Sequence, residues 1–276
     1  MRLLMIVGVA LSIVSCHRSE EPSTVRGKLF MLVSESHLPL IKEEAAQFMT
    51  IYDKTKITAV GTTTREAIVA LLNDSVRCIC VDRKLNEEEL NVVQRSGIKL
   101  ATVRIGRDAL VVIVNDENPL RTISLGTVKA ILEKSVTTWG KVPGSRMTGR
   151  LELVLAGKNS GSYELLQRGF FSLAKEIVPD KIGDTEKQIV GYVAATPGAL
   201  GIVSLAAVVG HPKGIHTLAV ETPDSTLKNE AVIPSQSNVY EELYPLNYSL
   251  YLYISEPTLG VGSGFSTFVM TLHGQQ

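Results

Sequence analysis

This sequence of 276 residues is poor in cysteine, in aromatic side chains and in net charge. It holds 3 Cys and 5% aromatic residues, and 28 Lys and Arg balance 28 Asp and Glu. Without an excess of basic residues, the chain has no overall positive field to hold a polyanionic backbone, which argues against nucleic-acid binding as its main task. No apolar run reaches the roughly 20 residues that a membrane-spanning helix needs. Any recognition of charge must therefore be local.

What the sequence does hold is typical of a globular protein. Hydrophobic residues make up 45% of the chain, beside 22 Gly and 11 Pro, and this composition excludes disorder, collagen and coiled coil. The length exceeds the size at which a single hydrophobic core usually stops growing. We therefore expect two lobes rather than one.

Residues 1–16 have the pattern of a signal peptide. Their apolar run, from residue 3 to residue 14, is too short to cross a bilayer. It ends in Ile13-Val14-Ser15-Cys16, which resembles a bacterial lipobox and predicts lipid modification of Cys16. The expected location is the bacterial cell envelope, facing the periplasm or the outer surface. A plain secretory signal or a buried N-terminal strand is the alternative. Residues 17–27 are polar and aperiodic and predict a flexible tether.

The two remaining cysteines, Cys78 and Cys80, alternate on one face of a predicted strand. A disulfide between them would be strained, because same-face positions in an extended chain lie roughly 6.6 Å apart at Cα. No His lies close to them in the sequence, so a metal site is not expected. The pattern predicts two buried free thiols, and the chain indicates neither a metal nor a cofactor.

Apolar periodicity alternates between strand and helix along the chain, which predicts α/β lobes. Thr63 with Glu66, and Asn86 with Glu89, have the spacing of capping boxes and mark two helix starts. Further helices are predicted over 40–52, 124–134, 162–178 and 265–272. Strands are predicted over 28–33, 57–60, 76–81, 98–104, 109–114, 151–156, 201–205, 215–220 and 249–254, of which 98–104 and 109–114 have the apolar runs of strands buried on both faces.

Three strand-to-helix junctions carry small hydroxyl residues: Ser34-Glu35-Ser36, Gly61-Thr62-Thr63-Thr64 and Asn159-Ser160-Gly161-Ser162. Free N–H groups and the positive end of the dipole at a helix N-terminus favour an anion, and hydroxyls add rotatable donors. One such junction is only a capped helix, and three in one chain are unsurprising by chance. A shared oxyanion pocket is therefore one hypothesis, beside that of three ordinary helix caps.

Longer motifs along most of the chain resemble the PstS-type phosphate-binding proteins, the two-lobed substrate-binding subunits of ABC importers. The resemblance runs from about Lys28 to the C-terminus, and its most specific piece is Gly106–Asn115. The other pieces follow in the family's order: Thr137–Gly144, Asn159–Glu164, Thr196–Val203, Tyr244–Tyr251 and Phe268–Gln275.

The resemblance implies an α/β, two-lobed type II periplasmic-binding-protein fold with two crossing hinge segments, near 104–111 and 247–253. One lobe is expected to comprise 28–105 and 252–276, and the other 106–251. The implied function is capture of phosphate or a similar tetrahedral oxyanion between the lobes, by a monomer and without catalysis, for delivery to the membrane subunits of an importer. The alternative is a divergent sensor or accessory module of an envelope complex, with altered or lost anion binding.

Carried over position by position, the resemblance also implies a set of ligand residues. Asp82 falls where phosphate binders place an Asp or Ser. A carboxylate there accepts a hydrogen bond from a protonated oxyanion and repels fully ionised sulfate, although Asp82 could equally be a strand-end residue paired with Arg83. The complete expected set is Ser34, Glu35, Ser36, Thr62, Thr63, Asp82, Ser160, Gly161 and Ser162.

Two departures from the family pattern concern charge. Ala156 stands where the family has an Arg, which removes a bidentate partner for phosphate. Glu35 stands where the family has Thr, and a second carboxylate facing an anion is costly unless a cation offsets it. Lys158 and Arg65 are the candidate replacements for the missing cation, and each could instead be a solvated surface charge.

Overall fold

The computed structural model describes residues 23–172, 174–221, 231–256 and 259–271. The predicted signal peptide, Cys16 and most of the predicted tether lie outside these ranges. Among the described residues, helices are too short or too polar for any of them to cross a bilayer.

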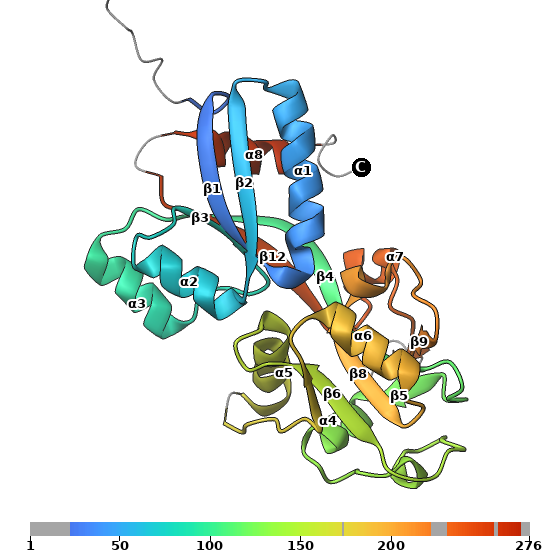
Figure 1. Ribbon diagram of the computed structural model, residues 1–276. Helices are drawn as coiled ribbons and strands as arrows, with labels where there is room; N and C mark the ends of the chain where they lie inside the picture. Colours follow the sequence, from blue (N-terminus) through green and yellow to red (C-terminus); the bar gives the residue numbers. More distant parts are fainter. Residues whose placement is uncertain (1–22, 173, 222–230, 257–258, 272–276) are drawn as a thin grey trace, which may run out of the picture.

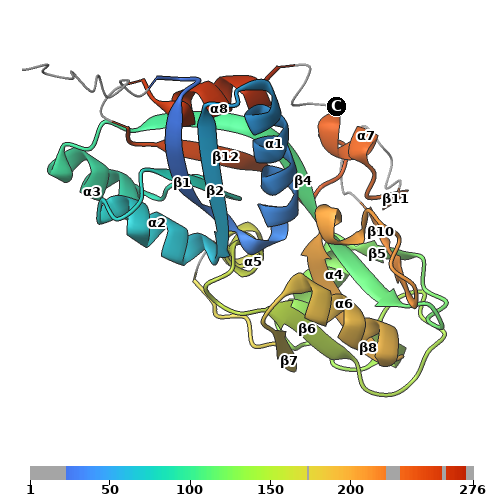
Figure 2. The ribbon, with the colours of Figure 1, turned by 45° about the horizontal axis from the view of Figure 1, so that its top comes forward.

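The chain forms two α/β lobes joined by a pair of long strands (Figures 1 and 2). One large sheet runs through both lobes in the order β2-β1-β3-β12-β4-β8-β6-β7, and β9 also pairs with β4. Its strands are β1 (Gly27–Ser34), β2 (Thr55–Thr62), β3 (Cys78–Val81), β12 (Asn247–Ile254), β4 (Ala101–Asn115), β8 (Ala199–Ser204), β6 (Glu152–Ala156), β7 (Lys181–Gly183) and β9 (Ile215–Thr217). A small second sheet contains β11 (Ala231–Val232), β10 (Ala219–Glu221) and β5 (Thr122–Ser124).

The strands β4 and β12 make the crossing between the lobes. They pair antiparallel from Asn247 opposite Ala109 to Ile254 opposite Ala101, and the register shifts between Leu250 and Tyr251. Beyond this ladder, β4 continues alongside β8 through residues 110–114. A single strand therefore belongs to both lobes, and it bends at an irregularity between them. The lobe boundaries expected from the sequence, 105/106 and 251/252, remain a prediction.

The first lobe packs helices on both faces of its sheet. Alternate residues of β1, Leu29, Met31 and Val33, point into a core that also holds Phe48 and Phe265. These two aromatic residues belong to α1 (Leu38–Ile51) and α8 (Val261–Val269). A second core on the other face includes residues of α2 (Thr64–Leu72), with α3 (Glu87–Ser96) beside it. Cys78 and Cys80 are buried free thiols in β3, as predicted.

The second lobe has one core cluster, into which β4 sends every side chain from Ala109 to Val114. Its helices are α4 (Leu125–Leu132), α5 (Gly161–Phe171), α6 (Glu186–Ala195) and α7 (Gln236–Tyr240), with short 3-10 turns at 139–141 and 205–208. Trp139 is fully buried, and its indole N–H donates to the carbonyl of Gly198 at 2.9 Å.

Two strand predictions need correction. The runs 98–104 and 109–114 are parts of one strand, β4, because its first half pairs with β12 and its second half with β8. The polar segment between the two runs therefore stays in the ladder. Only the second half of β4 is buried on both faces, since Ala101, Thr102 and Arg104 in its first half are exposed. The run 215–220 is two short strands, β9 and β10, that join different sheets.

Two helix predictions also need correction. The helix predicted over 162–178 ends at Phe171, because Ser172 adopts a left-handed conformation with φ of 48°. The apolar periodicity continues to Ile177, whose N–H and carbonyl both bond the hydroxyl of Tyr163. The last helix starts at Val261 rather than at residue 265.

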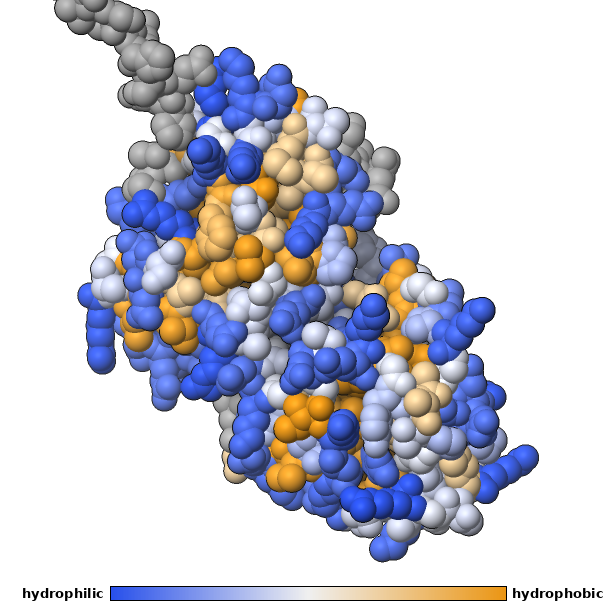
Figure 3. All heavy atoms as spheres, viewed as in Figure 1, coloured by the Kyte–Doolittle hydropathy of each residue, from blue (hydrophilic) through white to orange (hydrophobic). Residues whose placement is uncertain are grey.

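The surface around the lobe junction is mostly hydrophilic, whereas apolar side chains gather over the β1–β2 side of the first lobe (Figure 3). Phe30 and Val60, on β1 and β2, are 51% and 42% exposed there. They follow from the strand alternation, since their neighbours in each strand face the core.

Candidate functional site

Helix N-termini from both lobes meet at the junction. Thr63 caps α2 by accepting a hydrogen bond from the Glu66 N–H at 3.3 Å, within the predicted capping box. Ser160 caps α5 by accepting from the Tyr163 N–H at 3.2 Å. Ser34 ends β1, where a 3-10 turn, η1 (Glu35–His37), leads into α1. The three predicted hydroxyl-bearing loops thus lie at the junction of the lobes.

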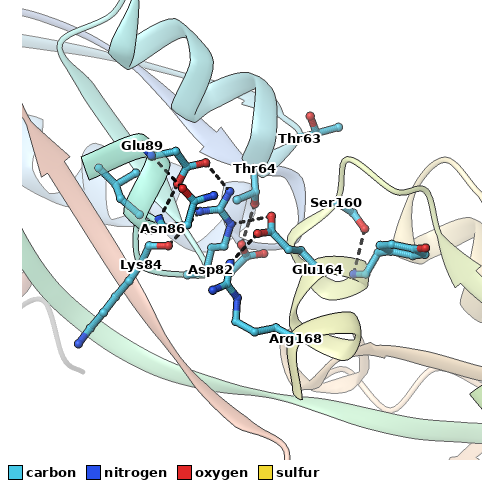
Figure 4. A network of polar contacts seen from close by, with 12 residues as sticks. Thr63, Thr64, Asp82, Lys84, Asn86, Glu89, Ser160, Glu164 and Arg168 are labelled. Carbon is cyan, nitrogen blue, oxygen red and sulfur yellow. Dashed lines mark hydrogen bonds and ion pairs between the residues drawn. The ribbon is translucent and has the colours of Figure 1, made fainter. Parts of the chain in front are cut away.

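Asp82 lies between the starts of α2 and α5 (Figure 4). It follows β3 directly, is 3% exposed, and accepts a hydrogen bond from the Thr64 hydroxyl at 2.7 Å. Burial raises the pKa of this carboxyl, although the charge of His37 and the bond from Thr64 oppose the rise. Thr64, which belongs to the predicted junction but not to the expected ligand set, is the threonine of its loop that contacts Asp82. The hydroxyl of Thr62 donates to Glu66 instead.

The Asp82 carboxylate touches the other lobe at Gly161, the first residue of α5. A Cβ at position 161 would stand 1.8 and 2.0 Å from the two carboxylate oxygens, so only glycine fits there. The backbone of Arg65 also donates across the junction, to the carbonyl of Asn159 at 3.4 Å. These contacts join the two lobes, so the structure is a closed form.

Arg83 forms an ionic latch across the same junction. Its guanidinium bonds Glu164 of α5 at 2.7 Å and Glu89 of α3 at 2.7 and 2.8 Å. The Arg83 side chain is 4% exposed. The alternative in which Asp82 serves as the partner of Arg83 is thus not observed, because the guanidinium bonds these two glutamates.

A buried histidine network stands beside the predicted ligand loops, and sequence reasoning missed it. His37 is 1% exposed. Its Nδ1 lies 3.0 Å from Ser34 Oγ, and its Nε2 lies 2.9 Å from Asp108 Oδ2. Tyr248 donates to the same Asp108 oxygen at 3.0 Å, and the Ala109 N–H donates to the other oxygen at 2.7 Å. Asp108 and Tyr248 face each other across the β4–β12 ladder.

Ser34, His37 and Asp108 are the residue types of a hydrolase triad, but the geometry is reversed. In such triads the serine bonds Nε2 and the carboxylate bonds Nδ1. Here the serine bonds Nδ1 and the carboxylate bonds Nε2. The arrangement therefore does not reproduce the contacts of such a triad.

A third carboxyl group, Glu186, lies near His37 from the other lobe. It starts α6 and accepts hydrogen bonds from the N–H and hydroxyl of Ser204, at 2.8 and 2.6 Å. Burial raises the pKa of Glu186, while the Ser204 bonds and the charge of His37 lower it. The junction therefore combines Asp82, Asp108 and Glu186 with one imidazole.

The charged residues predicted from the family pattern lie elsewhere. Lys158 is exposed and pairs with Glu176, and Arg65 is exposed on the first turn of α2. Glu35 is exposed as well, with its Cγ near Gly61. Ala156 is buried at the end of β6. None of these contacts favours Lys158 or Arg65 as the replacement cation, so their ligand roles remain predictions.

The remaining predicted residues lie in the first and third of the three hydroxyl-bearing loops. Ser162 is buried and lies 3.3 Å from Ser160 between hydroxyl oxygens, and Ser36 is half-buried. Ser160 also donates to the carbonyl of Gly157 at 2.7 Å. Within the described ranges, no group of three or more His, Cys, Asp or Glu side chains is arranged to hold a metal ion.

The protein should be more stable in mild acid than in mild base. Burial raises the pKa of Asp82 and Glu186, and for His37 the hydrogen bond and charge of Asp108 outweigh the lowering by burial and raise the pKa. Each group binds its proton more tightly when folded. Its stabilising contribution is therefore complete below the unfolded pKa and is lost as pH rises through the folded pKa.

We expect the Tm in phosphate-free buffer to fall by roughly 2–4 °C, equivalent to ~1 kcal/mol, between about pH 6 and pH 8. Replacing His37→Gln should reduce this fall. The control His211→Asn replaces an exposed histidine whose φ of 47° asparagine tolerates, and it should leave the fall unchanged. A Tm that rises over this interval would contradict the prediction.

Comparison with known proteins shows the family to which this chain belongs. Residues 18–271 match the family model of the PBP superfamily domain. The chain is 25% identical over 277 aligned positions to the Phosphate-binding protein PstS of Pseudomonas aeruginosa, covering 93% of this chain and 82% of that protein. These matches span almost the whole chain.

Two solved structures share the fold at low identity. A putative phosphate ABC transporter substrate-binding protein from Clostridium perfringens, with bound phosphate, superposes with a TM-score of 0.77 at 20% identity and covers 90% of this chain and 95% of its own. The regulatory domain of CcmR from Synechocystis PCC6803, in complex with 2-PG, gives 0.60 at 15% identity and covers 89% and 96%. With a type II periplasmic-binding-protein fold and a family match over nearly its full length, this chain belongs to the PBP superfamily domain family, as a divergent relative of the PstS-type phosphate-binding proteins.

Proposed function

We propose that this protein is an extracytoplasmic solute-binding protein that captures phosphate, or a similar tetrahedral oxyanion, between its lobes for an ABC importer. The observation that carries the proposal is the position of Asp82. It stands between the N-termini of α2 and α5, where Ser160, Gly161 and Ser162 begin the helix of the opposite lobe. Free N–H groups there favour an anion.

Asp82 also accounts for the choice of anion. A carboxylate accepts a hydrogen bond from a protonated oxyanion but has no favourable contact with a fully ionised one. Sulfate carries no proton near neutral pH, whereas phosphate carries at least one. Phosphate should therefore bind and sulfate should be rejected.

Calorimetric titration of the purified protein with phosphate, sulfate and molybdate tests the proposal. Phosphate should give a Kd in the micromolar range or tighter. Asp82→Ala and Ser160→Ala should each weaken it by about 10–100-fold, the loss expected when one hydrogen bond to a charged group is removed. Absence of heat and of any thermal shift at millimolar phosphate would overturn the proposal.

The second candidate is the divergent sensor or accessory module. It is favoured by Ala156, which leaves the site without the family's Arg, and by the likeness in fold to a regulatory domain. A protein that fails to bind phosphate yet folds with a cooperative thermal transition would support this candidate over the importer function.

We further propose that Cys16 carries a lipid anchor at the bacterial cell envelope. The lipobox-like sequence before it is the support. Replacement Cys16→Ala should release the protein from the membrane fraction. Unchanged membrane association of that variant would show that the anchor is not at Cys16.

A further inference from the structure

The protonation state of His37 determines what Ser34 can offer to a ligand. Asp108 Oδ2 lies 2.9 Å from His37 Nε2, so this nitrogen carries its hydrogen toward the carboxylate. A neutral imidazole then has a bare Nδ1, which must accept the Ser34 O–H, 3.0 Å away. In the imidazolium form, Nδ1–H donates to Ser34 Oγ instead. The serine hydrogen is then free to point elsewhere.

This difference matters at an anion site. A serine whose hydrogen is committed to His37 can present only lone pairs to a ligand, and these repel an oxyanion. A serine that accepts from the imidazolium can donate to one. Ser34 is 3% exposed at the end of β1, so water has little access to its hydroxyl. The direction in which this hydroxyl donates therefore depends on His37 and on the bound ligand.

The charges that act on His37 are all acidic. Asp108 comes from β4, Asp82 from the residue after β3 and Glu186 from α6. The phenol of Tyr248, from β12, also lies beside His37 but is neutral, because burial raises its pKa well above the usual value. With the three carboxyl groups ionised, they would repel an entering oxyanion. A proton on His37 supplies a positive charge to a site that has Ala156 in place of the family's Arg. The net effect of its neighbours is to favour that proton.

We propose that His37 is a positioning residue that takes up a proton when the cleft binds its oxyanion, and that this proton turns Ser34 into a hydrogen-bond donor to the ligand. The inference rests on the proposed phosphate binding. By linkage, the oxyanion must raise the pKa of His37 by the same factor by which the proton raises the affinity for the oxyanion. Affinity should consequently fall as pH rises from the His37 pKa of the free protein to that of the complex.

The test is an NMR titration of the imidazole resonances of the purified protein against pH, in phosphate-free buffer and then at saturating phosphate. The His37 signal is assigned by its absence in His37→Asn. Phosphate should raise the pKa of His37 by about 1 unit or more, a tenfold coupling or ~1.4 kcal/mol. The same titrations repeated with sodium chloride at matched ionic strength in place of phosphate exclude a general effect of added anion.

Two serine variants locate the coupling. Ser34→Ala should bind phosphate more weakly and lose the His37 shift. Ser96→Ala, an exposed position of α3 whose hydroxyl donates to the carbonyl of Val92, should retain the shift. Phosphate binding without a shift of His37 in the wild-type protein would overturn the inference and leave the proposed function intact. A full shift in Ser34→Ala would also overturn it. Failure of the wild-type protein to bind phosphate at any pH would overturn the proposed function and, with it, the inference.

Discussion

Replacing Gly161→Ala should hold the two lobes apart. The new Cβ would stand 1.8 Å from a carboxylate oxygen of Asp82, far inside any van der Waals contact. Asp82 cannot swing away cheaply, because it is buried and tied to Thr64. We expect at least ~100-fold weaker phosphate binding, since one ligand loop would be displaced from the others and lose two or more charge-assisted hydrogen bonds.

Small-angle X-ray scattering measures the opening directly, as a larger radius of gyration than that of the wild-type protein. The matched control is Gly169→Ala in the same helix, where a Cβ meets nothing within 4 Å. That variant should keep its shape and affinity and gain up to about 1 kcal/mol of stability, because alanine favours a helix interior. Adding Asp82→Gly to Gly161→Ala should restore the closed shape without restoring affinity. Wild-type scattering and affinity in Gly161→Ala would contradict the prediction.

Replacing Arg83→Met should destabilise the protein by about 3 kcal/mol. Methionine keeps much of the stem's packing, but it leaves Glu89 and Glu164 close together without the charge that joins them. Removing one partner of a buried ion pair costs far more than the pair itself contributes. Urea denaturation followed by circular dichroism would give the change in the free energy of unfolding.

The control is Arg168→Met. Arg168 pairs with the same Glu164 at 2.9 Å, but its side chain is 41% exposed, so the loss should stay below about 1 kcal/mol. Glu164→Gln should mainly loosen the contact between lobes, whereas Glu89→Gln weakens the first lobe internally, since Glu89 also completes the capping box of α3. Equal losses for Arg83→Met and Arg168→Met would show that Arg83 is no latch.

Local chemistry made part of the fold predictable. The capping boxes at Thr63 and Asn86 are formed as expected, because each depends on residues only three positions apart. The end of α5 was not predictable in this way. Its apolar period runs on to Ile177, but Ser172 turns left-handed, and the hydroxyl of Tyr163 bonds the backbone of Ile177 outside the helix.

In the candidate site, too, short local motifs could be predicted from the sequence, whereas contacts between distant residues could not. Asp82 and the Ser160 loop were predicted as ligand residues because their motifs are short and resemble a family. His37 and Asp108 lie 71 positions apart, and Arg83 and Glu164 lie 81 apart. No periodicity or spacing links such pairs, since they meet only after the sheet has been ordered and the lobes closed.

The paired crossing of β4 and β12 has a mechanical consequence. Because the two strands are hydrogen-bonded to each other along the crossing, neither can rotate alone, and opening of the lobes becomes one bending motion centred on the register shift at Leu250. Asp108 and Tyr248 face each other in this same ladder, and both touch His37. A change in the angle between the lobes therefore also changes the environment of the His37 imidazole.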